Sequence, residues 1–203
     1  MKERKKAVVP AFRAGIWNAW LLVIPVIFAS HALSYSIVNR KAGLFLRPKY
    51  RKHERVSMAG LIGILMGLIA YSIFVPLKLE SAWFYVGFLI YLVGLVYGFL
   101  AMLSFATTPP DGPAVKGIFH ITRNPMSFGV FLIVLGTGIA CASWVFLVLS
   151  VVSLILVNIA VRAEERTCLE KYGDAYRIYM ERTPKWIGIP KSGKSDEAKS
   201  NES

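Results

Sequence analysis

Five stretches of this sequence contain almost no charged residues, and they limit the possible folds more than any other feature. The stretches are 16–38, 58–77, 83–105, 127–142 and 144–161. A charged side chain at the middle of a bilayer costs several kcal/mol, and about 20 apolar residues in a helix span its hydrocarbon core. The pattern therefore predicts an all-α fold, a polytopic membrane helical bundle with about five transmembrane helices.

The fourth and fifth stretches form a special pair. The fourth is short, about 24 Å long as a helix, and only Ser143 separates it from the fifth. So short a connection predicts a tight antiparallel hairpin. The residues just before 127 and just after 161 should therefore lie close together at one face of the membrane.

Glycines recur in the second and third stretches at spacings of three, four and seven residues. This spacing is typical of membrane helices whose backbones approach closely, but glycine is also common in membrane helices without that role. Both interpretations stay open from the sequence. The glycines are Gly60, Gly63, Gly67, Gly87, Gly94 and Gly98.

The chain has a net charge of +12, and its basic residues flank the apolar stretches, above all at 40–55 and from Arg162 onward. Basic surfaces bind nucleic acids or anionic lipid headgroups. Their place beside spanning stretches favours lipid, and we expect no nucleic-acid partner. The positive-inside rule favours a cytoplasmic C-terminus and an outside N-terminus. The basic residues in 1–13 oppose this: either that tail is translocated, or the first helix does not cross fully.

The sequence divides into four parts. Residues 1–15 form a basic tail, 16–105 hold three spans with the basic loop 40–55, 106–190 form a possible catalytic region, and 191–203 are Lys/Ser/Glu-rich and predicted to be disordered. The third part holds a loop, the hairpin 125–161 and a predicted interfacial amphipathic helix, 162–181. The two cysteines have no metal-ligand spacing, so we predict no metal site.

Two polar motifs flank the hairpin. Arg123-Asn124-Pro125 precedes it, and Pro125 suits the first turn of a helix, whose free N–H groups attract anions. Glu164-Glu165 follows it. Together the motifs would offer donors to an anion and carboxylates to a cation, as a zwitterionic amino-acid moiety requires; the methionine part of S-adenosylmethionine is one. Each motif alone also has a structural explanation, an arginine reaching headgroups or a solvated acidic helix segment.

The region 110–190 resembles the membrane methyltransferases that include isoprenylcysteine carboxyl methyltransferases and phospholipid N-methyltransferases. The chain departs from the family pattern at Asn124, where the prenylcysteine enzymes usually have His, and at Ser127, where the family usually has Tyr. The matching residues, in order, are Gly117, Phe119, Arg123, Asn124, Pro125, Gly129, Glu164, Glu165, Tyr172, Gly173, Tyr176, Tyr179, Pro184 and Lys185.

The resemblance implies an S-adenosylmethionine-dependent enzyme that acts on a lipid, a prenylcysteine-like molecule or a small hydrophobic acceptor, with its catalytic region in the cytoplasm. It implies catalytic roles for Arg123 and Glu165. For His120, an interfacial position without a role is the other explanation. The implied cofactor site consists of Gly117, Phe119, His120, Arg123, Asn124, Pro125, Glu164, Glu165, Tyr176 and Tyr179.

Two other functions stay open from the sequence. The run from Cys168 to Tyr179 is also similar to a C-terminal pattern of sterol reductases, which would use NADPH. A non-catalytic membrane scaffold is the second alternative, since Ser127 replaces the usual Tyr.

Overall fold

A computed structural model of the chain describes residues 13–28, 31, 48–109, 112–186 and 188. All the named elements in this part are helices, and the predicted all-α fold is confirmed. The predicted tail 191–203, residues 1–12, the second half of the first span and residues 40–47 of the loop 40–55 lie outside the described residues. Residues 20–28 are helical. The named helices are α2 (Lys52–Ser72), α3 (Ala82–Ala106), the 3₁₀ helix η1 (Gly117–His120), α4 (Pro125–Ala140), α5 (Trp144–Tyr172) and α6 (Asp174–Arg182).

Three of these helices, α2, α3 and α5, are long and apolar enough to cross a membrane, and α4 is a shorter apolar helix of 16 residues. Large apolar side chains such as Trp83, Leu89 and Ile155 are exposed along the bundle. In water such a surface would be unfavourable, whereas lipid chains solvate it well. The chain is therefore a membrane protein.

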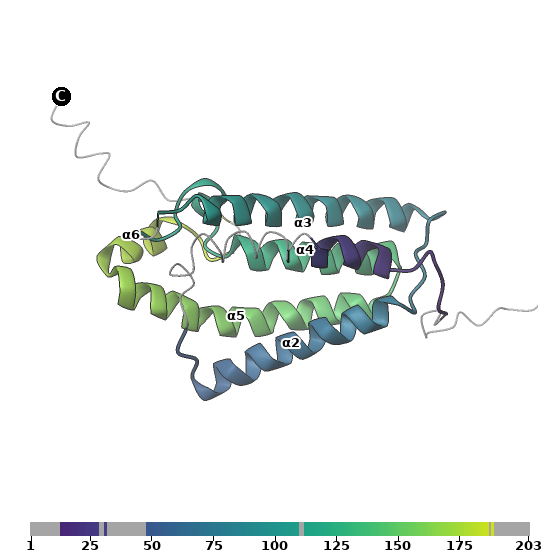
Figure 1. Ribbon diagram of the computed structural model, residues 1–203, viewed down its shortest axis with the longest axis horizontal. Coiled ribbons are helices and arrows are strands. Elements are labelled where there is room, and N and C mark those ends of the chain that lie inside the picture. The colour runs from purple at the N-terminus through teal and green to yellow at the C-terminus, as the bar shows by residue number, and fades with distance from the viewer. Residues whose placement is uncertain (1–12, 29–30, 32–47, 110–111, 187, 189–203) are drawn as a thin grey trace, which may run out of the picture.

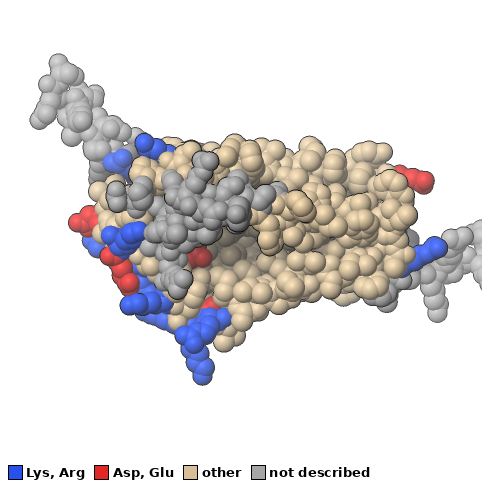
Figure 2. Space-filling model, in the orientation of Figure 1, with Lys and Arg blue, Asp and Glu red and all other residues tan. Residues whose placement is uncertain are grey.

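The helices lie side by side along the long axis, with α3 next to α4 and α2 next to α5 (Figure 1). The starts of α2 and α4 and the ends of α3 and α5 share one end of the bundle, together with α6. Most of the Lys, Arg, Asp and Glu side chains gather at that end, while the flank in view is free of charge (Figure 2). Residues 48–51, the loop 106–124 and the C-terminal segment therefore meet at one charged end, as expected from their basic residues.

Close backbone contact between α3 and α4 requires glycine. A Cβ atom on Gly87 would lie 2.2 Å from the Ala140 nitrogen, and one on Gly136 would lie 2.5 Å from the Tyr91 nitrogen. In α2, by contrast, nothing lies within 4 Å of a Cβ placed on Gly63 or Gly67. The glycine spacing thus reflects close packing at Gly87 and Gly94 of the third predicted span, whereas an added Cβ would meet nothing at Gly98 or at these two positions of the second.

The predicted amphipathic helix 162–181 is divided in two. The transmembrane helix α5 continues to Tyr172, and Gly173 then adopts a φ of +55°, a conformation that favours glycine. The shorter helix α6 follows, and it ends where Thr183 becomes extended. The break folds α6 back over the end of the hairpin, which a single continuous helix could not reach.

Candidate active site

The loop before α4 is held against α3 by η1. Gly117, at a φ of +63°, lies so close to α3 that a Cβ atom there would be 2.4 Å from Ser104 Oγ. The same Oγ accepts a hydrogen bond of 3.4 Å from the Ile118 N–H. Because a 3₁₀ helix has three residues per turn, Phe119 points inward and is buried while the adjacent His120 is exposed.

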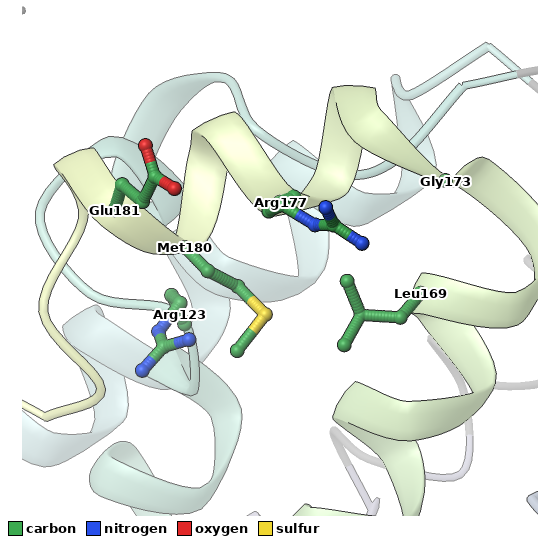
Figure 3. A pocket seen from close by; sticks show the side chains of 6 residues that line it. All are labelled: Arg123, Leu169, Gly173, Arg177, Met180 and Glu181. Carbon is green, nitrogen blue, oxygen red and sulfur yellow. The ribbon is translucent and has the colours of Figure 1, made fainter.

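Arg123, which directly precedes α4, borders two cavities. The outer one has a volume of about 390 Å³ and lies under α6 (Figure 3). It is lined by Arg123, Leu169, Gly173, Arg177, Met180 and Glu181. The inner one has a volume of about 540 Å³. Arg123 therefore lines both the outer and the inner cavity.

The inner cavity is lined by residues 48 and 50, the end of α3, the loop before α4, the start of α4, the end of α5 and α6. The predicted site residues line it, except Gly117 and His120. Gly117 serves the close approach to α3 instead. The lining residues are Pro48, Tyr50, Met102, Phe105, Thr108, Gly112, Pro113, Ala114, Phe119, Arg123, Asn124, Pro125, Met126, Ser127, Glu164, Glu165, Cys168, Tyr172, Tyr176 and Tyr179.

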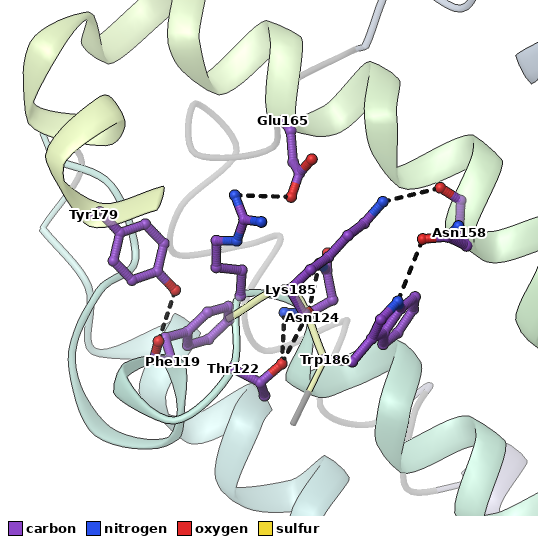
Figure 4. A network of polar contacts seen from close by, with 9 residues as sticks. Phe119, Thr122, Asn124, Asn158, Glu165, Tyr179, Lys185 and Trp186 are labelled. Atoms are coloured by element: carbon purple, nitrogen blue, oxygen red, sulfur yellow. Dashed lines mark hydrogen bonds and ion pairs between the residues drawn. The ribbon is translucent and has the colours of Figure 1, made fainter. Parts of the chain in front are cut away.

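The centre of the site is a buried pair of opposite charges. Arg123 Nη1 lies 3.3 Å from Glu165 Oε1, and the two side chains are 12% and 13% exposed (Figure 4). The contact is an ion pair without hydrogen-bond geometry. Arg123 Nε and Nη1 and Glu165 Oε1 find no hydrogen-bond partner among the described residues. Since buried polar atoms are nearly always hydrogen-bonded, these free donors and this free acceptor indicate a ligand site.

The segment after α6 is hydrogen-bonded to residues 122–124, directly before α4 (Figure 4). The Arg123 N–H donates to Pro184 O at 3.0 Å. Lys185 O accepts from both Thr122 Oγ1 at 3.0 Å and Asn124 Nδ2 at 3.1 Å. The Asn124 amide, predicted to receive a cofactor, therefore already has a structural partner, and it fixes the position of Arg123.

Two further hydrogen bonds tie the same segment to α5. Lys185 Nζ donates to Asn158 O at 3.1 Å, and Trp186 Nε1 donates to Asn158 Oδ1 at 3.3 Å. Burial is the main cause that lowers the pKa of Lys185, and the nearby Arg162 and Arg123 lower it further while Glu165 raises it. Residues 184–186 thus connect the loop, α4 and α5.

The two adjacent carboxylates differ in their surroundings. Glu165 faces Arg123, whereas Glu164 is exposed to the cavity, and its charge is one cause that raises the pKa of Tyr50. Successive residues of an α-helix point about 100° apart, so one helix turn presents its carboxylates to different parts of the cavity. No pattern in the sequence predicted this division.

Two tyrosines of α6 complete the wall. Tyr179 donates a hydrogen bond of 2.7 Å to Phe119 O, and the rings of Tyr176 and Tyr179 lie 5.5 Å apart. Burial raises the pKa of both phenols well above the usual range. Both hydroxyl groups therefore stay protonated, and that of Tyr179 serves as a donor that holds η1 to α6.

The substitution Tyr179→Phe is expected to lower the free energy of unfolding by about 1–2 kcal/mol, because a buried carbonyl loses its donor. Thermal unfolding in detergent micelles measures this. Tyr85→Phe is the matched control, since Tyr85 is 65% exposed and its hydroxyl has no partner among the described residues. Equal stability of the two variants would mean that the Tyr179 hydrogen bond does not hold α6 to η1.

The chain also matches a known protein family. The sequence model of a family described as phospholipid methyltransferase matches residues 56–175 of the 203. The matched range is more than half of the chain, starts in α2 and ends in α6, and includes Arg123, Glu164 and Glu165. No individually curated protein matches the chain.

Proposed function

Because the chain belongs to the phospholipid methyltransferase family, we propose that it transfers the methyl group of S-adenosylmethionine to a lipid, a prenylcysteine-like molecule or another small hydrophobic acceptor. The family makes the chain a membrane methyltransferase, as the resemblance indicated. The cofactor, the acceptor class and a cytoplasmic location of the charged end are our proposal. The observation that carries it is the pair of Arg123 and Glu165, with their unused buried polar atoms, inside one cavity.

The residues present fit this cofactor. The free Arg123 donors suit a carboxylate, and the free Glu165 oxygen suits an ammonium group. Their 3.3 Å separation allows a single amino-acid moiety to contact both. The aromatic rings of Phe119, Tyr176 and Tyr179 line the same cavity and suit adenine or a sulfonium. The cavity volume of about 540 Å³ lies in the range of small-molecule sites.

The residues of the chain would act mainly by positioning. When bound, the cofactor supplies an activated methyl group, whose bond to sulfur breaks as the bond to the acceptor forms. Arg123 and Glu165 orient the donor, and the hydrogen bonds of Thr122 and Asn124 to Lys185 O keep the Arg123 backbone in place. Met102, Phe105 and Met126 provide apolar wall that excludes water. Alignment of two reactants in a dry site lowers the barrier to the transfer.

A transfer assay tests the proposal. The purified protein, placed in vesicles of phosphatidylethanolamine and phosphatidylglycerol with labelled S-adenosylmethionine, is expected to label the lipid fraction, and mass spectrometry identifies the methylated species. A thermal shift assay with S-adenosylmethionine and with NADPH is carried out in parallel. Stabilisation by NADPH and not by S-adenosylmethionine would support a reductase instead, and stabilisation by neither would support a non-catalytic scaffold.

Cysteine protection gives a second test that needs no acceptor. Cys168 lines the cavity, whereas Cys141 is 3% exposed and lies in a hydrophobic cluster at the end of α4, away from the cavity. Saturating S-adenosylmethionine should slow modification of Cys168 by a small thiol reagent at least about ten-fold, since one bound ligand covers most of such a cavity. Cys141 is the internal control, read by peptide mass spectrometry. Unchanged modification of Cys168 would place the ligand elsewhere.

A further inference from the structure

A second ion pair lies at the charged end, between the first turn of α2 and the end of α5, with a buried carboxylate and a partly exposed guanidinium group. Arg166 Nη1 donates to Glu54 Oε1 at 3.0 Å, and Arg166 Nη2 donates to Glu54 Oε2 at 2.8 Å. The Glu54 residue is only 1% exposed. The two residues are 112 positions apart in the chain, so their bidentate contact joins the helices.

Both partners also hold the backbone of the preceding segment. Glu54 Oε2 accepts a hydrogen bond of 2.7 Å from the Arg51 N–H, and Arg166 Nη2 donates one of 2.9 Å to Lys49 O. The residue between these two anchors is Tyr50. Its neighbours are therefore fixed on both sides by one ion pair.

The segment fixed in this way is a wall of the inner cavity. Pro48 and Tyr50 line it together with Glu164. They precede residue 56, where the family match begins. Neither Pro48 nor Tyr50 is among the residues assigned to the cofactor, so this wall is available to the acceptor.

The energetics favour a positioning role over a merely stabilising one. A buried ion pair contributes little net stability, since the loss of hydration nearly offsets the attraction. The planar guanidinium fork, however, holds a carboxylate in one geometry. Here both carboxylate oxygens and the Lys49 carbonyl are engaged. What this arrangement provides is a fixed position of residues 49–51.

We propose that the Glu54–Arg166 pair is a positioning clamp, which holds residues 48–51 as a wall of the cavity and presents the Tyr50 hydroxyl to the methyl acceptor. The assignment of Tyr50 to the acceptor rests on the proposed function. Burial and the charge of Glu164 raise the pKa of Tyr50, so its phenol stays protonated and donates a hydrogen bond. Tyr50 is then a specificity-determining residue that selects acceptors able to receive that bond.

The clamp itself is tested without cofactor or acceptor. In the full chain with Cys168→Ser and Tyr50→Cys, a membrane-impermeant thiol reagent should label position 50 at least about ten-fold faster when Glu54→Gln is added, because the charged hydrogen bonds that hold residues 49–51 are weakened. Cys141 at the other end of the bundle should stay unlabelled. Unchanged labelling at position 50 would overturn the clamp. If Cys141 also becomes reactive, the same labelling is measured in the Arg166→Lys variant, which keeps the charge without the planar fork. Faster labelling of position 50 there, with Cys141 unlabelled, supports the clamp, and unchanged labelling overturns it.

The role of Tyr50 is tested by kinetics in the phosphatidylethanolamine vesicles. Tyr50→Phe should raise the KM for lipid about ten-fold, the effect of one hydrogen bond, and leave the Kd for S-adenosylmethionine unchanged. If the variant bound both the lipid and S-adenosylmethionine more weakly, to a similar extent, the acceptor role would be overturned. Asp174→Asn, which breaks the exposed Arg177–Asp174 pair, is the control. If the wild-type protein binds no S-adenosylmethionine, the proposed function fails while the labelling still decides the clamp.

Discussion

Replacement of Arg123 by alanine is expected to weaken the binding of S-adenosylmethionine at least about 100-fold. Each charged hydrogen bond to a ligand contributes about 1.5–3 kcal/mol, and Arg123 has two buried nitrogens available. The substitution also leaves Glu165 buried without its cation, which disfavours the charged carboxylate. Titration of the purified protein with the cofactor measures the effect.

Glu165→Gln should reduce the affinity comparably, since it keeps the size of the side chain but removes the negative charge that faces the ammonium group. Arg55→Ala is the matched control, because Arg55 is exposed on α2 and precedes the family match. Circular dichroism should show that all three variants remain helical. Wild-type affinity in both Arg123→Ala and Glu165→Gln would favour a non-catalytic membrane protein.

Gly136→Ala is expected to destabilise the bundle by about 3 kcal/mol, near the upper end of the usual range for overpacking. The three atoms nearest to the new methyl group would all be backbone atoms of α3, two of them from Tyr91 and the third Gly87 O at 2.6 Å. A backbone cannot rotate away as a flexible side chain does, so the two helices must separate. Unfolding in detergent micelles, followed by circular dichroism, measures the change.

The control for this prediction is Gly63→Ala in α2, where nothing lies within 4 Å of the added methyl group. Alanine favours a helix over glycine by about 1 kcal/mol, so this variant should be as stable as the wild type or slightly more stable. Equal unfolding of the Gly136→Ala variant and the wild type would contradict the close contact of α3 and α4. That contact also positions the start of α4, and hence Arg123, against the cavity wall from α3.

Helix positions and the meeting of Arg123 with Glu165 followed from the sequence for one physical reason. The bilayer excludes charge, so apolar length alone marks a spanning helix. The fourth and fifth spans together are too long for a single crossing of the hydrocarbon core, so the residue between them marks a hairpin, whose two ends lie together. Local chemistry, with Pro125 at a helix start and acidic residues at a helix end, then indicated what the corner offers a ligand.

The tertiary structure decided what depends on contacts between distant parts of the chain. Gly63 and Gly136 look alike in sequence, and only their neighbours distinguish them. The inward turn of Phe119 and the outward turn of His120 depend on Gly117 approaching Ser104 of α3. Tyr50 enters the cavity because Glu54 meets Arg166, a partner 112 residues away that no periodicity within either helix reports. A sequence pattern describes the face of its own helix, whereas the partner of that face is set by how the helices pack.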